Sequence, residues 1–261
     1  MDGFGVSKAL QGLSAWLINL DRSAQRLAQM EERIAALGAP FEVRRFSAVD
    51  GKAHPELIAQ VDQEAFISAI GRPILAGEIG VYFSHLRVWQ QFLQSDAEVA
   101  LVMEDDVVFH EDFLPALQVA LENVARWDML KLNKIRAKAP ITQFSAAGYD
   151  FNAYLGVATG YGAYLITRDA AERLLTQLLP IRMPIDHATA RYYDLDLRLL
   201  GMEPFPSHVD DGGASTITGQ HFNAVQKPKP WMRLPSYFWR LRGDIGRLFW
   251  LKKNGMLKKR R

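Results

Sequence analysis

The chain has 261 residues, 49% of them hydrophobic, which indicates one globular domain with a full core, or one domain with a tail, and excludes a disordered chain. It has no cysteine, which excludes disulfide scaffolds, thiolate zinc sites and cysteine nucleophiles and fits a reducing, cytoplasmic compartment. The net charge of +2 is uneven: residues 227–261 hold 12 of the 31 basic residues and one of the 29 acidic ones, a net of +11 against −9 for residues 1–226.

The first fifty residues predict a βαβ unit. AWLINL (15–20) has the composition of a buried strand, and the apolar residues over 27–37 then follow at helical spacing until Gly38 ends the helix. FEVRRFSAV (41–49) predicts the next strand, and Asp50-Gly51 has the chemistry of a turn. This length is typical of the βαβ unit of a parallel sheet.

The rest of the body predicts further alternation, after an irregular stretch with short helical pieces. The expected elements are a helix over 77–95, a strand within 98–113, strands over 127–132 and 162–168, and a helix over 169–179. Such alternation predicts an α/β fold with a mostly parallel, Rossmann-like sheet and helices on both faces. Three prolines at 228, 230 and 235 mark the boundary between a domain at 1–226 and a tail at 227–261.

Polar residues follow most of the predicted strands. Asp21-Arg22, Asp50-Gly51, the carboxylate run 104–106 and residues 131–133 all come directly after strand sequences. In an open α/β sheet, ligands bind beyond the carboxyl ends of the strands. We therefore expect these four groups to meet along one edge of the sheet and to form a binding site there.

The carboxylate run Glu104-Asp105-Asp106 is the main candidate for chemistry. Three adjacent carboxylates repel one another, and they end an apolar strand sequence. Oxygen ligands of this kind suit Mg²⁺ or Mn²⁺, which complete their coordination with substrate phosphates. The alternative is a solvated acidic turn. The position directly after a buried strand favours the metal site.

Other candidates each have a structural alternative. Arg22 and Arg26 lie one helical turn apart beside the same edge and suit a phosphate, or else a solvated helix face. Ser84 and His85 lie in a largely apolar helix, where a buried structural histidine is the commoner case. No P-loop, dinucleotide-binding GxGxxG or GxSxG pattern occurs in a fitting context. Weaker candidates are a general base, Asp186, and two possible metal ligands, His208 and His221.

The basic tail predicts an amphipathic helix. Phe238, Leu241, Ile245 and then Leu248 or Phe249 fall at helical spacing, with Arg and Lys around them and aromatic residues nearby. This pattern is typical of a helix that lies in a membrane interface, and the alternative is a helix packed on the body. Nucleic acid is disfavoured as a partner because the body is acidic. No signal peptide is visible, and no apolar run reaches the roughly 18 residues expected of a membrane span.

Taken together, six motifs resemble glycosyltransferase family 25, which includes lipooligosaccharide and lipopolysaccharide β-galactosyltransferases. The resemblance covers about residues 14–220, where the motifs occur in the family's order. It implies a GT-A type fold, a UDP-sugar donor (most often UDP-galactose), a divalent cation and inversion at the anomeric carbon. The motifs are INLDRSAQR (18–26), FSAVDG (46–51), GEIGVYFSHLRVW (77–89), LVMEDDVVF (101–109), WDMLKL (127–132) and GYGAYLITRDAAERLL (160–175).

The resemblance also assigns roles to residues. Glu104 and Asp106 are expected to hold Mn²⁺ or Mg²⁺, with His208 and His221 as further candidates, and Asp186 to act as the general base, although Glu104, Asp210 and Asp211 stay open for that role. Val81 and Phe83 depart from the family's usual Cys and Leu without a change in polarity. The expected donor-binding residues are Asn19, Arg22, Arg26, Asp50, Glu78, Ser84, His85, Asp105 and Lys131.

The sequence therefore predicts a peripheral glycosyltransferase at the inner leaflet of the cytoplasmic membrane. It would move a hexose from a UDP-sugar to a lipid-linked oligosaccharide acceptor, with the tail on the anionic membrane surface. Two alternatives stay open. One is a metal-dependent phosphoester hydrolase, which usually needs two metal ions. The other is a membrane-associated sugar-nucleotide binding protein without turnover.

Overall fold

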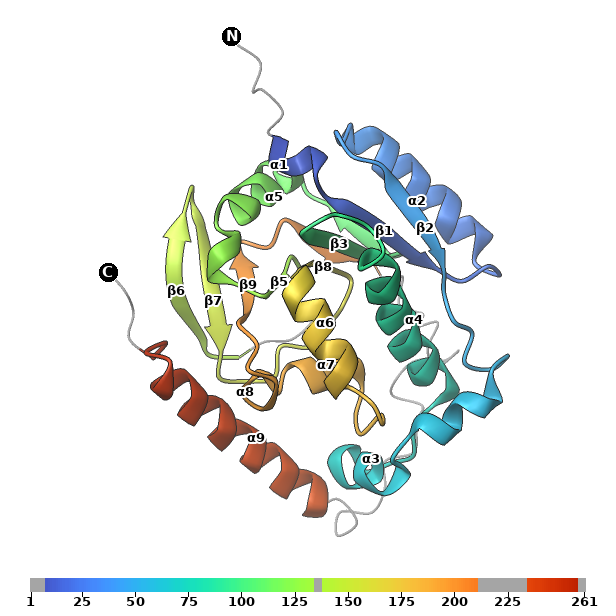
Figure 1. Cartoon of the computed structure of the whole chain (residues 1–261), viewed down its shortest axis with the longest axis vertical. Coiled ribbons are helices and arrows are strands. Elements are labelled where there is room, and N and C mark those ends of the chain that lie inside the picture. The colour runs from blue at the N-terminus through green and yellow to red at the C-terminus, as the bar shows by residue number, and fades with distance from the viewer. Residues whose placement is uncertain (1–7, 134–137, 211–233, 258–261) are drawn as a thin grey trace.

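The computed structural model describes residues 8–133, 138–210 and 234–257 (Figure 1). The helices are α1 (Lys8–Gln11), α2 (Ala24–Leu37), η1 (Pro55–Gln60), α3 (Gln63–Ile70), α4 (Ala76–Phe92), α5 (Phe113–Glu122), η2 (Val124–Arg126), α6 (Arg168–Gln177), α7 (Ile185–Thr189), α8 (Tyr192–Leu195) and α9 (Leu234–Lys253). The strands are β1 (Ser14–Asn19), β2 (Val43–Ser47), β3 (Val99–Glu104), β4 (Val107–Phe109), β5 (Met129–Lys131), β6 (Pro140–Ala146), β7 (Tyr149–Tyr154), β8 (Ala163–Thr167), β9 (Leu199–Glu203) and β10 (Ser207–Val209).

Eight of these strands form one central sheet in the order β2-β1-β3-β8-β5-β9-β7-β6. The pairs β1–β2, β1–β3 and β5–β9 are parallel, and the pairs on either side of β8 and β7 are antiparallel. Helices flank the sheet, so the predicted α/β class is confirmed (Figure 1). The second, small sheet pairs β4 with β10.

The strand directions are more mixed than the sequence pattern indicated. A parallel neighbour needs a crossover connection of a dozen or more residues, usually a helix. That condition holds for β1–α2–β2, the predicted βαβ unit, whose helix ends at Gly38 with φ 61° as expected. By contrast, β7 leads to β8 without an intervening helix, and β8 runs antiparallel to β3 and β5.

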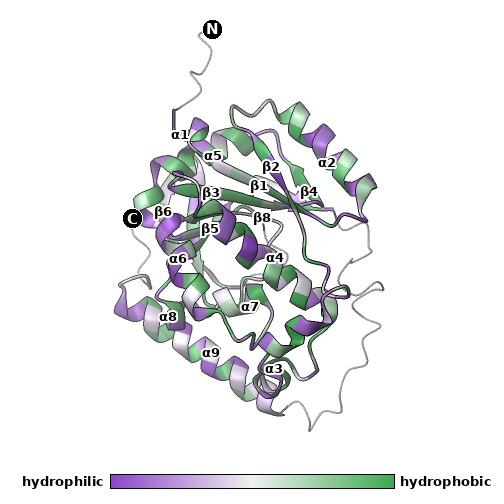
Figure 2. Ribbon diagram, turned by 45° about the vertical axis from the view of Figure 1, so that its right-hand side comes forward, coloured by the Kyte–Doolittle hydropathy of each residue, from purple (hydrophilic) through white to green (hydrophobic). Residues whose placement is uncertain are grey.

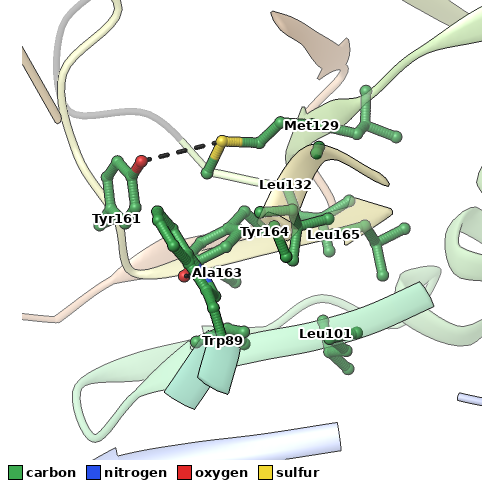
Figure 3. Packing of buried hydrophobic residues seen from close by; sticks show 14 of the residues in the cluster. Trp89, Leu101, Met129, Leu132, Tyr161, Ala163, Tyr164 and Leu165 are labelled. Atoms are coloured by element: carbon green, nitrogen blue, oxygen red, sulfur yellow. Dashed lines mark hydrogen bonds between the residues drawn. The ribbon is translucent and has the colours of Figure 1, made fainter. Parts of the chain in front are cut away.

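The core lies around β3, β8 and β5 and is closed by aromatic side chains. Trp89 of α4 and Tyr164 of β8 are fully buried, as are Leu101 and Met129 (Figure 3). The hydroxyl of Tyr161 contacts the Met129 sulfur at 3.8 Å. Figure 2 shows the central strands as predominantly hydrophobic. Because both faces of β1 and β3 are covered, their sequences are nearly continuous apolar runs, as is usual for buried strands.

The C-terminal helix α9 packs along the body beside α3 and α8 (Figure 1). Its Leu251 side chain is fully buried in the main core cluster. Within the three described segments, no helix has both the length and the apolar character needed to cross a membrane.

Candidate active site

The carboxyl ends of β1, β2 and β3 lie side by side. Asn19 of β1 is opposite Ser47 of β2, and Ile18 is opposite Glu104 of β3. The carboxylate run that follows β3 therefore begins beside the loop that carries Asp50. Four polar groups were expected to meet at one edge of the sheet, and this is confirmed for the three groups that follow β1, β2 and β3.

Asp105 is held by two donors from the first βα unit. Asn19 Nδ2 donates to Asp105 Oδ2 at 2.7 Å, and Arg26 donates to Oδ1 at 2.9 Å. Asn19 is itself fixed, because Arg45 donates to its Oδ1 from both Nε and a terminal nitrogen at 3.1 Å. Both oxygens of Asp105 are thus engaged by protein groups, and this carboxylate anchors the turn after β3.

Asp106, unlike Asp105, is not held by hydrogen bonds at both of its carboxylate oxygens. Its Oδ1 is buried and has no hydrogen-bond partner among residues 8–133, 138–210 and 234–257, and its Oδ2 lies 3.8 Å from Arg26. Burial, together with the nearby charges of Glu104 and Asp105, raises the pKa of Asp106 to about 7, against the opposing effect of Arg26. A buried carboxylate oxygen beside other carboxylates is a fitting ligand for a hard divalent cation.

Glu104 is oriented by a chain of buried hydrogen bonds. His85 Nε2 lies 3.3 Å from Glu104 Oε1, His85 Nδ1 lies 2.9 Å from the Tyr164 hydroxyl, and Trp89 Nε1 donates to that hydroxyl at 2.8 Å. The indole of Trp89 can only donate, so the Tyr164 hydroxyl accepts from it. In the tautomer with the ring proton on Nε2, this hydroxyl donates to His85 Nδ1 and the Nε2–H points toward Glu104. Burial raises the pKa of Tyr164 well above its usual value and keeps this donor protonated.

Asp50 is positioned by the close approach of its loop to α4. Val49 N donates to Ser84 Oγ at 2.8 Å, and Ser84 Oγ donates to the Gly80 carbonyl at 2.7 Å. A Cβ at Gly51 would overlap the Ala76 carbonyl oxygen, so only glycine allows this contact. The loop then presents Asp50 to Arg22, with which it forms an ion pair at the partly exposed edge.

Glu78 fixes the start of α4 and the segment that leads into it. It accepts two 2.7 Å hydrogen bonds from Arg72 and one from the Leu75 backbone at 2.9 Å, which caps α4. Glu78, Ser84 and His85, predicted as donor-binding, are buried side chains bonded to protein groups. Their hydrogen bonds to other protein groups place them behind the residues that reach the edge.

Lys131, Gly160 and Asp186 form a second group. The Lys131 ammonium is buried and donates to the carbonyls of Ala158 and, at 2.8 Å, of Gly160. Gly160 N donates to Asp186 Oδ2 at 3.1 Å, and His187 N donates to Oδ1 at 2.8 Å. Burial lowers the pKa of Lys131 to about 8, although Asp186 and Glu104 act to raise it. Lys131 thus holds the loop that holds Asp186.

The predicted histidine ligands lie apart from this arrangement or outside the described residues. His208 of β10 is exposed and pairs with His110 at 2.9 Å. His221 and Asp211 lie outside the described residues. β10 still reaches the site through its end, because Asp210 N donates to the Asp106 carbonyl at 2.9 Å. In the segments that the structure describes, no three or more His, Asp or Glu side chains are grouped as a ready metal cage.

Two arginines at the site, Arg45 and Arg72, were not singled out by sequence reasoning, and Asn133 was included only as part of the group 131–133. Arg45 joins Asn19 to Asp21, at 2.5 Å from the latter, and Arg72 holds Glu78. Asn133 Oδ1 accepts from Ala163 N, while its Nδ2 is buried without a partner in the described part of the chain. Arg45 lies in β2, which was predicted as a strand, two residues before its carboxyl end.

With this geometry in place, the chain can be compared with known proteins. The model of "Glycosyltransferase family 25 (LPS biosynthesis protein)" matches residues 13–189, which is more than half of the chain. The chain belongs to glycosyltransferase family 25. The matched region of this family 25 chain contains the carboxylate run, the first βα unit and Asp186. The resemblance seen in the sequence motifs is therefore confirmed, and a role in glycosyl transfer is supported.

Relatives in this family include animal proteins. A "Glycosyltransferase 25 family member" of Anopheles gambiae is 28% identical over 82% of this chain and 40% of its own length. "Procollagen galactosyltransferase 1-B" of Xenopus laevis is 28% identical over 64% of this chain and 31% of its own. "Probable inactive glycosyltransferase 25 family member 3" of Rattus norvegicus is 25% identical over 74% and 38%. The chain spans less than half the length of these curated relatives.

Proposed function

We propose that this family 25 chain transfers a hexose from a UDP-sugar to a saccharide acceptor, with inversion at the anomeric carbon. The observation that carries the proposal is Asp106 Oδ1, a carboxylate oxygen buried without a partner in the described segments, beside Glu104 at the carboxyl edge of the sheet. A buried carboxylate in this state is costly unless a cation meets it. The arginines of the first βα unit supply positive charge at the same edge.

Asp106 and Glu104 are the residues that would hold Mn²⁺ or Mg²⁺. Within the described residues, Asp106 keeps one oxygen without a partner, and Glu104 is partly exposed and lies beside His85. Asp105, by contrast, is already bound by Asn19 and Arg26. When bound, the ion supplies Lewis-acid stabilisation of the charge that develops on the departing diphosphate. Arg22 and Arg26 would bind the donor through its phosphates.

Asp186 is the proposed general base. Its two oxygens are fixed by the N–H groups of Gly160 and His187, so the carboxylate is held in one orientation. In the proposed step the acceptor hydroxyl gives its proton to Asp186, its oxygen bonds to the anomeric carbon, and the bond from that carbon to the diphosphate oxygen breaks. Lys131 keeps the Gly160 loop in position for this step.

The donor and acceptor are proposed from the family. Relatives named procollagen galactosyltransferases support galactose as the hexose, and the description of the family model supports a lipopolysaccharide-type acceptor. With a lipid-linked acceptor, the proposed reaction would take place at the inner leaflet of the cytoplasmic membrane. One relative is named as probably inactive. A sugar-nucleotide binding protein without turnover therefore stays the competing function for this chain.

A donor screen tests the proposal. The purified full chain is incubated with individual UDP-hexoses, a set of saccharide acceptors and Mn²⁺, Mg²⁺ or EDTA, and released UDP is measured. We expect acceptor-dependent UDP release, highest with UDP-galactose and lost in EDTA and in Asp106→Ala. The matched control is Asp96→Ala, an exposed aspartate before β3, which should keep wild-type turnover.

Each alternative has its own outcome in this screen. Release of inorganic phosphate from phosphoesters without an acceptor would identify a hydrolase. Binding of UDP-sugar without UDP release in any reaction would identify a non-catalytic binder. Either result overturns the proposed transfer.

A further inference from the structure

The outward face of α9 is apolar and exposed. Five large side chains, each between 46% and 69% exposed, follow one another at intervals of three, four, three and one residues along this helix. This spacing places them within about 100° of the helix circumference, as one continuous stripe. The residues of this stripe, called the outer stripe below, are Phe238, Leu241, Ile245, Leu248 and Phe249.

The opposite face of α9 fixes which side points outward. Arg247 is buried and donates to the carbonyls of Leu155 and Ala190, and Gly246 lies so close to Tyr193 that a Cβ would stand 2.5 Å from the ring. The helix thus docks on the body through Arg247 and Gly246, and through the buried Leu251 near its end. A surface helix of a soluble domain normally buries its apolar stripe. In α9 the apolar stripe between 238 and 249 faces outward instead, while Arg247 and Leu251 face the body.

Basic side chains accompany the outer stripe. Arg240, Arg242, Lys252 and Lys253 are exposed on the same helix, and Figure 2 shows hydrophilic and hydrophobic residues alternating along it. The surrounding segment 227–261 carries a net charge of +11, while the rest of the chain carries −9. An apolar stripe bordered by arginine and lysine on a helix with tryptophan is the pattern of a helix in the headgroup region of a bilayer.

We propose that α9 docks on an anionic membrane surface, with its axis in the membrane plane and the outer stripe in the headgroup region. The charge excess would be attracted by anionic lipid, and the stripe would gain apolar contacts there. A second copy of the chain fits less well, because a two-fold contact through α9 would bring two basic helices face to face. This docking does not depend on the transfer reaction.

Vesicle sedimentation tests the docking. The full chain is spun with vesicles of phosphatidylcholine alone or with about 30% phosphatidylglycerol, at low and high salt. We expect binding to the anionic vesicles that weakens in salt. Replacing Leu241, Ile245 and Phe249 by serine should weaken binding at least about tenfold, and Arg240→Gln with Arg242→Gln by about fivefold for each charge.

The matched control is Ile58→Ser, which removes an exposed isoleucine on η1 and should bind vesicles as the wild type does. Circular dichroism and turnover with a soluble saccharide acceptor are measured for every variant. Unchanged turnover with lost vesicle binding separates this proposal from the proposed function. Wild-type vesicle binding by the triple serine variant would overturn the docking. The docking would also be overturned if the wild type were a dimer, the triple serine variant were a monomer, and neither protein bound vesicles.

Discussion

Asn19 Nδ2 donates a 2.7 Å hydrogen bond to Asp105 Oδ2, and so ties the end of β1 to the carboxylate turn 86 residues further along the chain. Asn19 is buried, and its Oδ1 accepts both hydrogen bonds from Arg45. The amide therefore joins an arginine to a carboxylate and keeps both in place. This relationship makes Asp105 the anchor of the turn and leaves Asp106 as the carboxylate that could bind a cation.

Asn19→Ala should lower the free energy of unfolding by about 2 kcal/mol, because it leaves charged partners at Arg45 and Asp105 without their amide. Urea unfolding followed by circular dichroism measures this change. Gln118→Ala, which removes an exposed amide on α5, should stay within about 0.5 kcal/mol of the wild type. Equal effects of the two substitutions would contradict the bridging role.

Asp106→Asn should separate metal binding from folding. The pKa of Asp106 is raised from 3.8 to about 7, so the folded state holds the proton more tightly and loses stability as pH rises through that window. At pH 8 the neutral amide should therefore raise the melting temperature of the metal-free protein, by about 2–5 °C.

The same variant should lose its response to Mn²⁺. In the wild type, Mn²⁺ at about 100 times its dissociation constant should raise the melting temperature by about 5 °C or more. Differential scanning fluorimetry with and without Mn²⁺ measures the shift, and Asp96→Ala serves as the control. A wild-type shift in Asp106→Asn would show that this carboxylate does not hold the ion.

Lys131→Met should change how stability depends on pH. The pKa of Lys131 is lowered from 10.5 to about 8, so between these values the unfolded chain binds more protons and this group makes stability rise with pH. The difference in unfolding free energy, wild type minus variant, should rise by at most about 1.4 kcal/mol per pH unit from pH 8 to about pH 10. Urea unfolding at several pH values measures it, and a flat difference contradicts the assignment.

Asp186→Asn should lower kcat by about 10²–10⁴ once a turnover assay exists, because the amide cannot accept the acceptor proton. The dissociation constant for UDP, measured by calorimetry, should stay within about twofold, since the proposed phosphate contacts come from other residues. Asp194→Asn, at an exposed carboxylate paired with Arg191, is the control and should keep its kcat. Loss of UDP binding in Asp186→Asn would instead point to a donor-binding role.

Two glycines of α9 should respond in opposite ways to alanine. A Cβ at Gly246 would stand 2.5 Å from the Tyr193 ring and push the helix from the body, whereas the nearest atom to one at Gly243 is the end of Arg247 at 3.4 Å. In limited proteolysis, the Gly246→Ala variant should be cleaved within α9 faster than the wild type. Gly243→Ala should be as resistant as the wild type or more so, because alanine favours helix by about 1 kcal/mol. Similar digestion rates would show that the close contact does not hold α9.

Local patterns in the sequence were sufficient for several elements. The apolar spacing before Gly38 predicted α2 and its left-handed cap, and the buried runs predicted β1, β3 and β8. The small sheet of β4 and β10 was not foreseen, because its strands are three residues long and nearly 100 residues apart. The β6–β7 hairpin was missed as well: Ala147 and Gly148 both have positive φ, and Ala-Gly is not the usual turn sequence.

The sequence by itself determined the α/β class, the family and the edge of the sheet where the polar residues gather, because periodicity and residue order are local properties of the chain. The sequence placed three carboxylates at that edge but did not distinguish their roles. The tertiary structure decided that Asp105 is bound by Asn19 and Arg26 and that Asp106 keeps a free oxygen within the described residues. It also decided which side of α9 faces outward, through the contacts of Arg247 and Gly246. Both outcomes depend on partners distant in sequence, whose positions follow only from the packing of the whole fold.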